Sequence, residues 1–291
     1  VTFGPDVEEI GLYAFQNCVN LKTVNCDDAL GIINAGAFKG CSSLESFDVS
    51  EATLATVGYE AFADCSSLKT FKTAETMSDI GDFAFANTKL EEIELGKNIA
   101  SVGVNTFKGV VTLKNINVVS KNKEFSSADG VLYNKKGTAI VTFPAGITGE
   151  FNLPAQVEVI RASAFADSSI SKVIVPEDSA LNTIETKAFE NSSIVAIEIP
   201  ANVTKLPSAV FKNASALKEV TFNEGLTYIG SSCFEGCEAL GSVKLPDSLH
   251  DIANSAFKNA GLKSLNTGDG LAKIDSEAFA GNKKLSDLYL G

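Results

Sequence analysis

The 291-residue sequence has very little of several residue types on which common functions depend. It contains one arginine (Arg161), one histidine (His250), one methionine and no tryptophan. Arginine usually supplies the paired hydrogen bonds that hold phosphates and carboxylates. Only 24 basic residues stand against 36 acidic ones, which gives a formal net charge of -12. Because nucleic acid is bound through many Lys and Arg contacts to phosphates, this composition argues against nucleic acid as a partner.

Long hydrophobic runs and the usual catalytic and metal-binding motifs are also absent. No segment approaches the roughly 20 apolar residues that span a membrane, so membrane insertion is not expected. Zinc-site and EF-hand spacings do not occur, and His250 lies in a linker, where a solvated residue is favoured over a general base. Incidental calcium binding at the acidic pairs 27–28 and 177–178 is a minor alternative. The sequence therefore predicts a protein that is not an enzyme and uses no metal or cofactor.

Phenylalanine, by contrast, is abundant and regularly spaced. Of 19 phenylalanines, eleven recur every 22 to 24 residues, with one gap of 58 residues. These eleven are Phe15, Phe38, Phe62, Phe85, Phe107, Phe165, Phe189, Phe211, Phe234, Phe257 and Phe279. A period of this length is the signature of a repeat protein whose coils stack on one another.

Each repeat carries further residues at fixed distances from its phenylalanine. Ile, Val or Leu stands five residues before it in every copy, and Leu or Ile stands five or six residues after it. Three residues later, an alternating apolar-polar segment has the period of a strand with one buried face. Asn, Asp or Gly stands two residues after each phenylalanine, which predicts a left-handed backbone that ends a one-turn helix.

These columns predict an α/β repeat solenoid, a right-handed leucine-rich-repeat array with a parallel β-sheet and short one-turn helices. We expect residues 1–291 to form a single solenoid of eleven repeats of about 23 residues, without a domain boundary. Both ends of the sequence fall at or beside a strand that has no polar cap. We therefore expect the rest of a longer polypeptide, or another contact, at one or both ends.

Residues 119–155 interrupt the repeat with an irregular insertion. Two apolar runs, 130–133 and 139–144, flank a four-residue turn that contains glycine, which predicts a β-hairpin. Protruding loops on rigid scaffolds commonly carry binding, so Phe125, Tyr133 and Phe143 are candidate protein-binding residues. The alternative is a hairpin that only covers a wider core and leaves none of these rings exposed.

The six cysteines are open to two interpretations. Cys18, Cys41, Cys65 and Cys237 stand three residues after a repeat phenylalanine, where most other copies carry another small residue. Cysteine packs as a small hydrophobic residue, so we favour free thiols. Stacked coils would also bring successive cysteines within disulfide distance, so the geometry does not exclude a bond.

Three segments carry a resemblance to a known family. They are residues 80–85 (I-G-D-F-A-F), 237–246 (C-E-A-L-G-S-V-K-L-P) and 125–135 (F-S-S-A-D-G-V-L-Y-N-K). Together they resemble the BspA-type leucine-rich repeat family. The resemblance implies a secreted or cell-surface protein of a bacterium, or of a protist, that adheres to host extracellular-matrix proteins or to other cells. It brings no shared catalytic or binding residue.

The outward side chains between the two apolar positions of each strand form the candidate binding surface. In successive early repeats they are Asp48, Lys72, Glu94 and Asn117. Mixed charge and few aromatic rings along this column favour a protein partner over a sugar. The sequence thus predicts a non-catalytic protein-binding or adhesion module, and the alternative is a structural spacer that holds another domain away from the cell surface.

Overall fold

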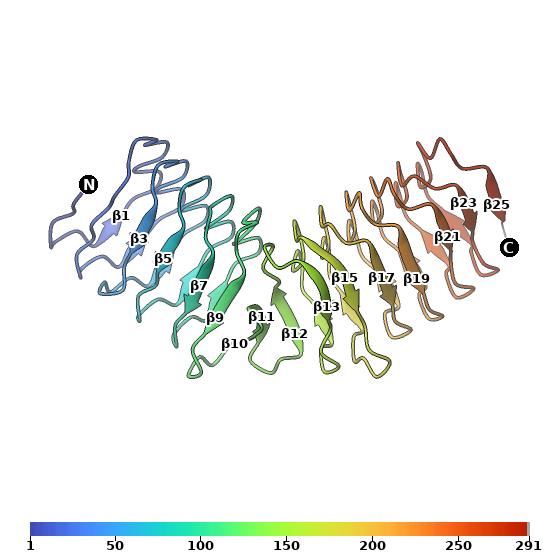
Figure 1. The fold of residues 1–291 in the computed structure, drawn as a ribbon, viewed down its shortest axis with the longest axis horizontal. Helices are drawn as coiled ribbons and strands as arrows, with labels where there is room; N and C mark the ends of the chain where they lie inside the picture. The colour runs from blue at the N-terminus through green and yellow to red at the C-terminus, as the bar shows by residue number, and fades with distance from the viewer. Residues whose placement is uncertain (290–291) are drawn as a thin grey trace. The chain divides into compact units, whose positions relative to one another are not determined.

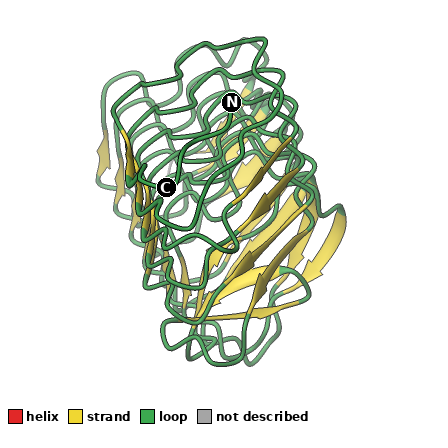
Figure 2. Ribbon diagram, turned by 90° about the vertical axis from the view of Figure 1, so that its left-hand side faces the viewer, coloured by secondary structure: helices red, strands yellow, loops and turns green. Residues whose placement is uncertain are grey.

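The computed structural model describes residues 1–289, which contain twenty-five short strands and no helix (Figure 2). The residues form two units. The first unit consists of Val1–Lys136 and Phe143–Gly146, and the second unit consists of Gly137–Thr142 and Ile147–Gly291. Within each unit, successive coils stack as a parallel β-solenoid (Figure 1). A single right-handed solenoid across all 291 residues stays a prediction.

Each coil of the first unit contributes to two sets of parallel strands. The isoleucine sheet contains the apolar position five residues before the phenylalanine, and the valine-leucine sheet contains the alternating segment. The isoleucine sheet of the first unit comprises β1 (Glu9–Ile10), β2 (Ile32–Ile33), β4 (Thr56–Val57), β6 (Asp79–Ile80) and β8 (Ser101–Val102). Its valine-leucine strands are β3 (Ser46–Asp48), paired with β5 (Thr70–Lys72), and β7 (Glu92–Leu95), paired with β9 (Asn115–Val118).

The second unit repeats this arrangement. Its isoleucine strands are β12 (Ala139–Thr142), β14 (Val159–Ile160) and β16 (Thr183–Ile184), followed by β18 (Lys205–Leu206), β20 (Tyr228–Ile229), β22 (Asp251–Ile252) and β24 (Lys273–Ile274). Its valine-leucine strands are β13 (Gly149–Asn152), β15 (Ile170–Ile174), β17 (Ala196–Ile199) and β19 (Glu219–Phe222), followed by β21 (Ser242–Lys244), β23 (Ser264–Asn266) and β25 (Asp287–Tyr289). The sequence predicted the valine-leucine strands and missed the isoleucine strands apart from β12, which lies in the predicted apolar run 139–144.

The repeat phenylalanines fill the space between the two sheets of each unit. Nine of the eleven are buried, and Phe15 and Phe279 are half-buried. Neighbouring rings within a unit stack with centroids 4.8 to 5.9 Å apart and planes 6° to 16° from parallel. Phe47 and Phe71 of the valine-leucine sheet meet this stack edge-on. The predicted phenylalanine core is therefore confirmed.

The predicted one-turn helices are wrong, because backbone donors in these segments serve the neighbouring coil. The amides of Phe62 and Asp64 donate to Ala84 O and Ala86 O of the next coil, each at 2.8 Å. The intervening amide of Ala63 donates back to Glu60 O at 3.1 Å. An α-helix is held by amides that donate to carbonyls of the same segment, four residues back. The segment is therefore a chain of tight turns.

Two left-handed residues in each repeat reinforce this arrangement. The Asn, Asp or Gly two residues after each phenylalanine has positive φ in all eleven copies, as the sequence predicted. A second residue with positive φ lies two residues before each phenylalanine, and it is often not glycine, as at Tyr13 (φ 55), Glu60 (φ 51) and Lys187 (φ 62). Left-handed residues four positions apart leave no room for a right-handed helical turn.

The insertion forms a β-hairpin at a place that the sequence analysis missed. Strands β10 (Phe125–Ala128) and β11 (Val131–Asn134) pair antiparallel around Asp129 and Gly130, which both have positive φ (51° and 79°). An Asp-Gly pair with two positive φ angles is a favoured two-residue hairpin turn. The predicted hairpin between residues 130–133 and 139–144 spans both units and stays a prediction. Strand β13 pairs in parallel with β15, so the regular repeat resumes there.

Candidate functional site

The predicted outward column of the first unit lies on the exposed face of the valine-leucine strands. Asp48, Lys72, Glu94 and Asn117 are all exposed, and the residues beside them in each strand are buried or turned to the core. Parallel pairing sets Asp48 opposite Lys72 and Glu94 opposite Asn117. The four candidates thus form two pairs of neighbouring residues on the exposed face of the valine-leucine strands.

Within this column, Asp48 and Lys72 form an ion pair. Lys72 Nζ lies 2.7 Å from Asp48 Oδ2, and Asp48 Oδ1 accepts hydrogen bonds from the amide and hydroxyl of Ser50 at 3.0 and 2.7 Å. The Lys72 hydrogen bond lowers the pKa of Asp48, and the reciprocal contact raises the pKa of Lys72. Both groups are therefore charged at neutral pH. Exposed pairs of this kind stabilise a fold very little, so both charges are available to a partner at little cost in stability.

The aromatic candidates of the insertion lie mostly inside the protein. Tyr133 is 5% exposed and Phe143 is 2% exposed, whereas Phe125 is half-buried. Burial raises the pKa of Tyr133 to about 12, with a smaller contribution from the charge of Asp129. Tyr133 and Phe143 therefore act as core residues, which corrects the expectation that they project from the surface. Strand alternation could not reveal this, because both faces of β11 are covered.

The insertion is anchored by a buried asparagine that the sequence analysis did not single out. Asn122 is 1% exposed, and its Nδ2 donates to Gly96 O and Ile99 O at 2.8 and 2.9 Å. Its Oδ1 accepts from the amides of Glu124 and Phe125 at 2.9 and 2.8 Å. Both donors and the acceptor are satisfied, so this amide fixes the start of β10 at low cost.

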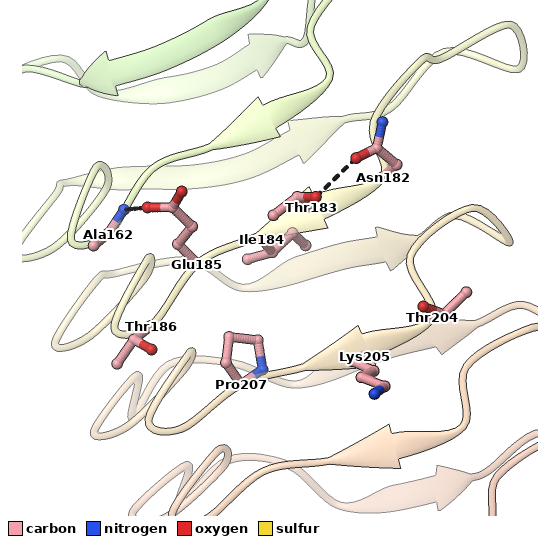
Figure 3. A pocket seen from close by; sticks show the side chains of 9 residues that line it. All are labelled: Ala162, Asn182, Thr183, Ile184, Glu185, Thr186, Thr204, Lys205 and Pro207. Atoms are coloured by element: carbon pink, nitrogen blue, oxygen red, sulfur yellow. Dashed lines mark hydrogen bonds between the residues drawn. The ribbon is translucent and has the colours of Figure 1, made fainter.

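A shallow groove interrupts the isoleucine sheet of the second unit (Figure 3). In neighbouring coils the residue after the strand donates its amide to the preceding coil, as Glu185 does to Ile160 O and Gly230 to Leu206 O. Pro207 occupies this position after β18 and has no N–H to donate, so β16 and β18 belong to separate sheets. The groove has a volume of about 460 Å³.

The groove offers polar groups and no catalytic pair. Glu185 accepts a hydrogen bond from the Ala162 amide at 2.8 Å (Figure 3), and it lies 3.3 Å from Arg161 Nη1. Lys205 makes no ion pair within residues 1–289. His250, two coils along, is exposed, and its Nδ1 lies 3.1 Å from Asp251 Oδ1. Within the described chain, no three His, Cys, Asp or Glu side chains lie close enough to hold a metal ion.

Three of the four aligned cysteines make the same contact in the core. The Sγ atoms of Cys41, Cys65 and Cys237 donate to the phenylalanine carbonyl of the preceding coil, each at 3.1 Å. All three are buried, whereas Cys18 is exposed. The contact explains why a small, weakly polar side chain suits this column.

We expect alkylation of the folded protein with iodoacetamide at about pH 8 to modify Cys18 first, because only the thiolate reacts and access is required. Burial and the charge of Asp48 raise the pKa of Cys26 to about 11, so Cys26 should react slowly although it is partly accessible. Peptide mass spectrometry with and without denaturant measures this order. Rapid modification of Cys41 or Cys65 in the folded protein, or recovery of a linked Cys18–Cys41 peptide, would contradict it.

The comparison with family models decides the identity of the repeats. The model described as "BspA type Leucine rich repeat region (6 copies)" matches residues 8–130, 147–260 and 208–291. The chain belongs to the BspA-type leucine-rich repeat family. Its phenylalanine, isoleucine and valine-leucine columns are thus those of a BspA-type repeat, as the motifs at 80–85 and 237–246 predicted.

Solved structures similar to this BspA-type chain include three bacterial proteins. A leucine-rich repeat protein from Eubacterium ventriosum is 24% identical with a TM-score of 0.77, covering 90% of this chain and 77% of its own. A leucine rich cell surface protein from Faecalibacterium prausnitzii is 26% identical with a TM-score of 0.74, covering 97% and 76%. The pneumococcal vaccine antigen PcpA is 22% identical with a TM-score of 0.71, covering 99% and 66%. These similarities confirm the leucine-rich-repeat fold.

The search of curated proteins found no match for this BspA-type chain. Within residues 1–289 there is no helix with the length and apolar character that crossing a membrane requires.

Proposed function

We propose that the chain is a non-catalytic protein-binding module of a secreted or cell-surface bacterial protein, and that it adheres to a host extracellular-matrix or cell-surface protein. The observation that carries this proposal is the exposed face of the valine-leucine strands. There, Asp48, Lys72 and Glu94 present charges on successive coils, above a closely stacked core. A rigid row of charged and polar side chains suits an extended protein surface better than a small substrate.

Surface placement is supported by analogy with similar proteins. The Faecalibacterium prausnitzii protein is described as a leucine rich cell surface protein, and PcpA is described as a vaccine antigen. We extend this location to the present chain on the strength of the shared repeat and fold.

The test is binding of the purified 291-residue chain to immobilised fibronectin, laminin and collagen, measured by biolayer interferometry. We expect at least one of these proteins to bind. Reversing the charges with Lys72→Glu and Glu94→Lys should weaken that binding about tenfold, as loss of complementary charges at an interface does. The matched control is Lys244→Glu with Glu198→Lys, which reverses the same charges on β21 and β17 of the second unit.

Two outcomes would count against this proposal. If none of these proteins nor any protein on host cells binds the chain, the structural spacer becomes the better account of its function. If binding occurs and neither charge-reversed variant weakens it, the valine-leucine face is not the binding surface.

A further inference from the structure

The isoleucine sheet of the first unit has an unusual number of exposed apolar side chains. Five large apolar residues on this sheet and on the turn that follows each strand are between 42% and 67% exposed: Leu12, Tyr13, Ile32, Tyr59 and Val104. Phe83, on the same series of turns, is half-buried and packs edge-on to Tyr59 with centroids 6.0 Å apart. Clustered exposed apolar groups of this kind mark interaction sites on soluble proteins.

Glycine follows the strand in several coils of this sheet. Gly58, Gly81 and Gly103 each follow a strand of the isoleucine sheet. A Cβ atom on any of them would lie 2.4 to 2.7 Å from the backbone of the preceding coil. Tyr13 lies against Gly36, where an added Cβ would come within 2.3 Å of its ring. These glycines let the coils stack closely, and Gly58 leaves backbone without a side chain next to Tyr59.

Three carboxylates on this sheet and its turns have no cationic partner. Glu9 accepts a hydrogen bond from Asn34 Nδ2 at 2.6 Å, and Asp82 accepts one from the Val104 amide at 2.8 Å. The third, Asp79, accepts from Ser78 Oγ. Across residues 1–289, none of the three forms an ion pair with a lysine, an arginine or the histidine. We call these three residues, with the five exposed apolar residues, the acidic-aromatic surface.

On the isoleucine strands and following turns of the second unit, among its described residues, one large apolar side chain is exposed, Ile274. The residue three before the phenylalanine is small or polar in all six of its repeats: Ala162, Thr186, Ser208, Ser231, Asn254 and Ser276. Its carboxylates on this side are largely paired, for example Glu185 with Arg161, Glu277 with Lys258 and Asp275 with Lys273. The acidic-aromatic surface is thus a property of the first unit and not of the repeat.

We propose that the acidic-aromatic surface binds a basic, lysine- or arginine-bearing segment of a protein partner. Charge complementarity selects this occupant, because three uncompensated carboxylates repel acidic ligands and attract cations. The tyrosine rings add a second reason, since lysine and arginine stack favourably on aromatic faces. At Gly58, Gly81 and Gly103 an extended segment can approach the backbone, because no side chain intervenes. This inference rests on the proposed protein-binding function and specifies where a partner docks and what its chemistry is.

The test uses the full chain and two fluorescein-labelled peptides of equal length, GKRYGKRYGKRYG and the neutral GSTYGSTYGSTYG. Fluorescence anisotropy should show that the basic peptide binds and that the neutral peptide does not. Tyr13→Ser with Tyr59→Ser should weaken binding of the basic peptide about tenfold or more, as removal of aromatic anchors does. Asp79→Asn with Asp82→Asn should also weaken it, and asparagine at position 82 keeps an oxygen for the Val104 amide.

Matched variants in the second unit separate this surface from general attraction to an acidic protein. Asp251→Asn with Asp275→Asn makes the same change in net charge, and Tyr228→Ser removes an isoleucine-sheet tyrosine. Both should bind the basic peptide within about twofold of the parent. Circular dichroism and melting temperature identify any variant that fails to fold, and single substitutions then replace the pair.

The inference is overturned if variants in the two units weaken binding equally. It is also overturned if the neutral peptide or a neutral glucose oligosaccharide binds as tightly as the basic peptide, because the surface would then select another class of ligand. Failure of fibronectin, laminin and collagen to bind the parent chain would instead count against the proposed host-protein function and leave the peptide result standing.

Discussion

Replacing Phe211 with alanine should lower the free energy of unfolding by about 3–5 kcal/mol, the usual range for truncating a buried phenylalanine. Phe211 is fully buried, and its ring stacks between Phe189 and Phe234 at 5.2 and 5.1 Å. Truncation would remove buried apolar area and both stacking contacts. Backbone hydrogen bonds tie this coil to the next one at Phe211 and Asn213 and to the preceding one at Phe189 and Asn191, so the neighbouring coils cannot close the cavity. Urea denaturation followed by circular dichroism measures the loss.

The matched control lies in the same column. Phe15 is half-buried and stacks face to face on one ring only, Phe38. Phe15→Ala should therefore cost clearly less than Phe211→Ala. A loss below about 1 kcal/mol for Phe211→Ala, or equal losses for the two variants, would mean that the phenylalanine stack is not the main source of stability.

The apolar columns of the repeat could be predicted from the sequence because each is set by burial alone. Phe, the preceding Ile and the following Leu recur at fixed spacing, and a residue type that is buried in every coil leaves the same mark eleven times. The left-handed positions after each phenylalanine were also readable, because Asn, Asp and Gly tolerate positive φ better than other residues do. Eleven concordant copies made these columns recognisable, which a single copy would not have done.

The predicted helices failed for a reason that no single repeat reveals. The positions two residues before each phenylalanine are left-handed yet carry Tyr, Glu, Phe, Lys and Ser as well as Gly, so residue type gives no signal there. Their conformation is imposed by hydrogen bonds between coils, such as Tyr13 N–H to Ala35 O at 3.0 Å. Tertiary stacking thus overrides local preference in this segment.

The candidate surfaces were only partly predictable. Exposure of Asp48, Lys72 and Glu94 followed from strand alternation. Burial of Tyr133 and Phe143 did not, because an irregular insertion has no repeat against which to align its residues. The acidic-aromatic surface was also not predicted. Leu12, Tyr59 and Val104 stand at one repeat position, three residues before the phenylalanine, but they differ in type from coil to coil and form no column of one residue type.

Replacing Gly81 with alanine should lower the free energy of unfolding by about 1–3 kcal/mol, the usual cost of adding atoms to a closely packed site. A Cβ at this position would lie 2.7 Å from Gly58 C and from Tyr59 N, which are backbone atoms and cannot rotate away. The Gly81 amide also donates to Val57 O at 2.8 Å, and widening the gap between the coils would stretch this bond. An opposing gain of about 0.4–1 kcal/mol comes from reduced freedom of the unfolded chain. The steric cost is the larger of the two.

Gly11 is the control for Gly81, because it stands at the same position of the repeat and an added Cβ would meet nothing within 4 Å. Only the unfolded-chain effect applies to Gly11→Ala, so this variant should be as stable as the parent or more stable by up to about 1 kcal/mol. Chemical denaturation of both variants side by side gives the comparison. If Gly81→Ala is as stable as Gly11→Ala, the coils can move apart enough to accommodate the added Cβ. Gly81 would then be no steric requirement of the stack, and glycine at this position would need a functional explanation.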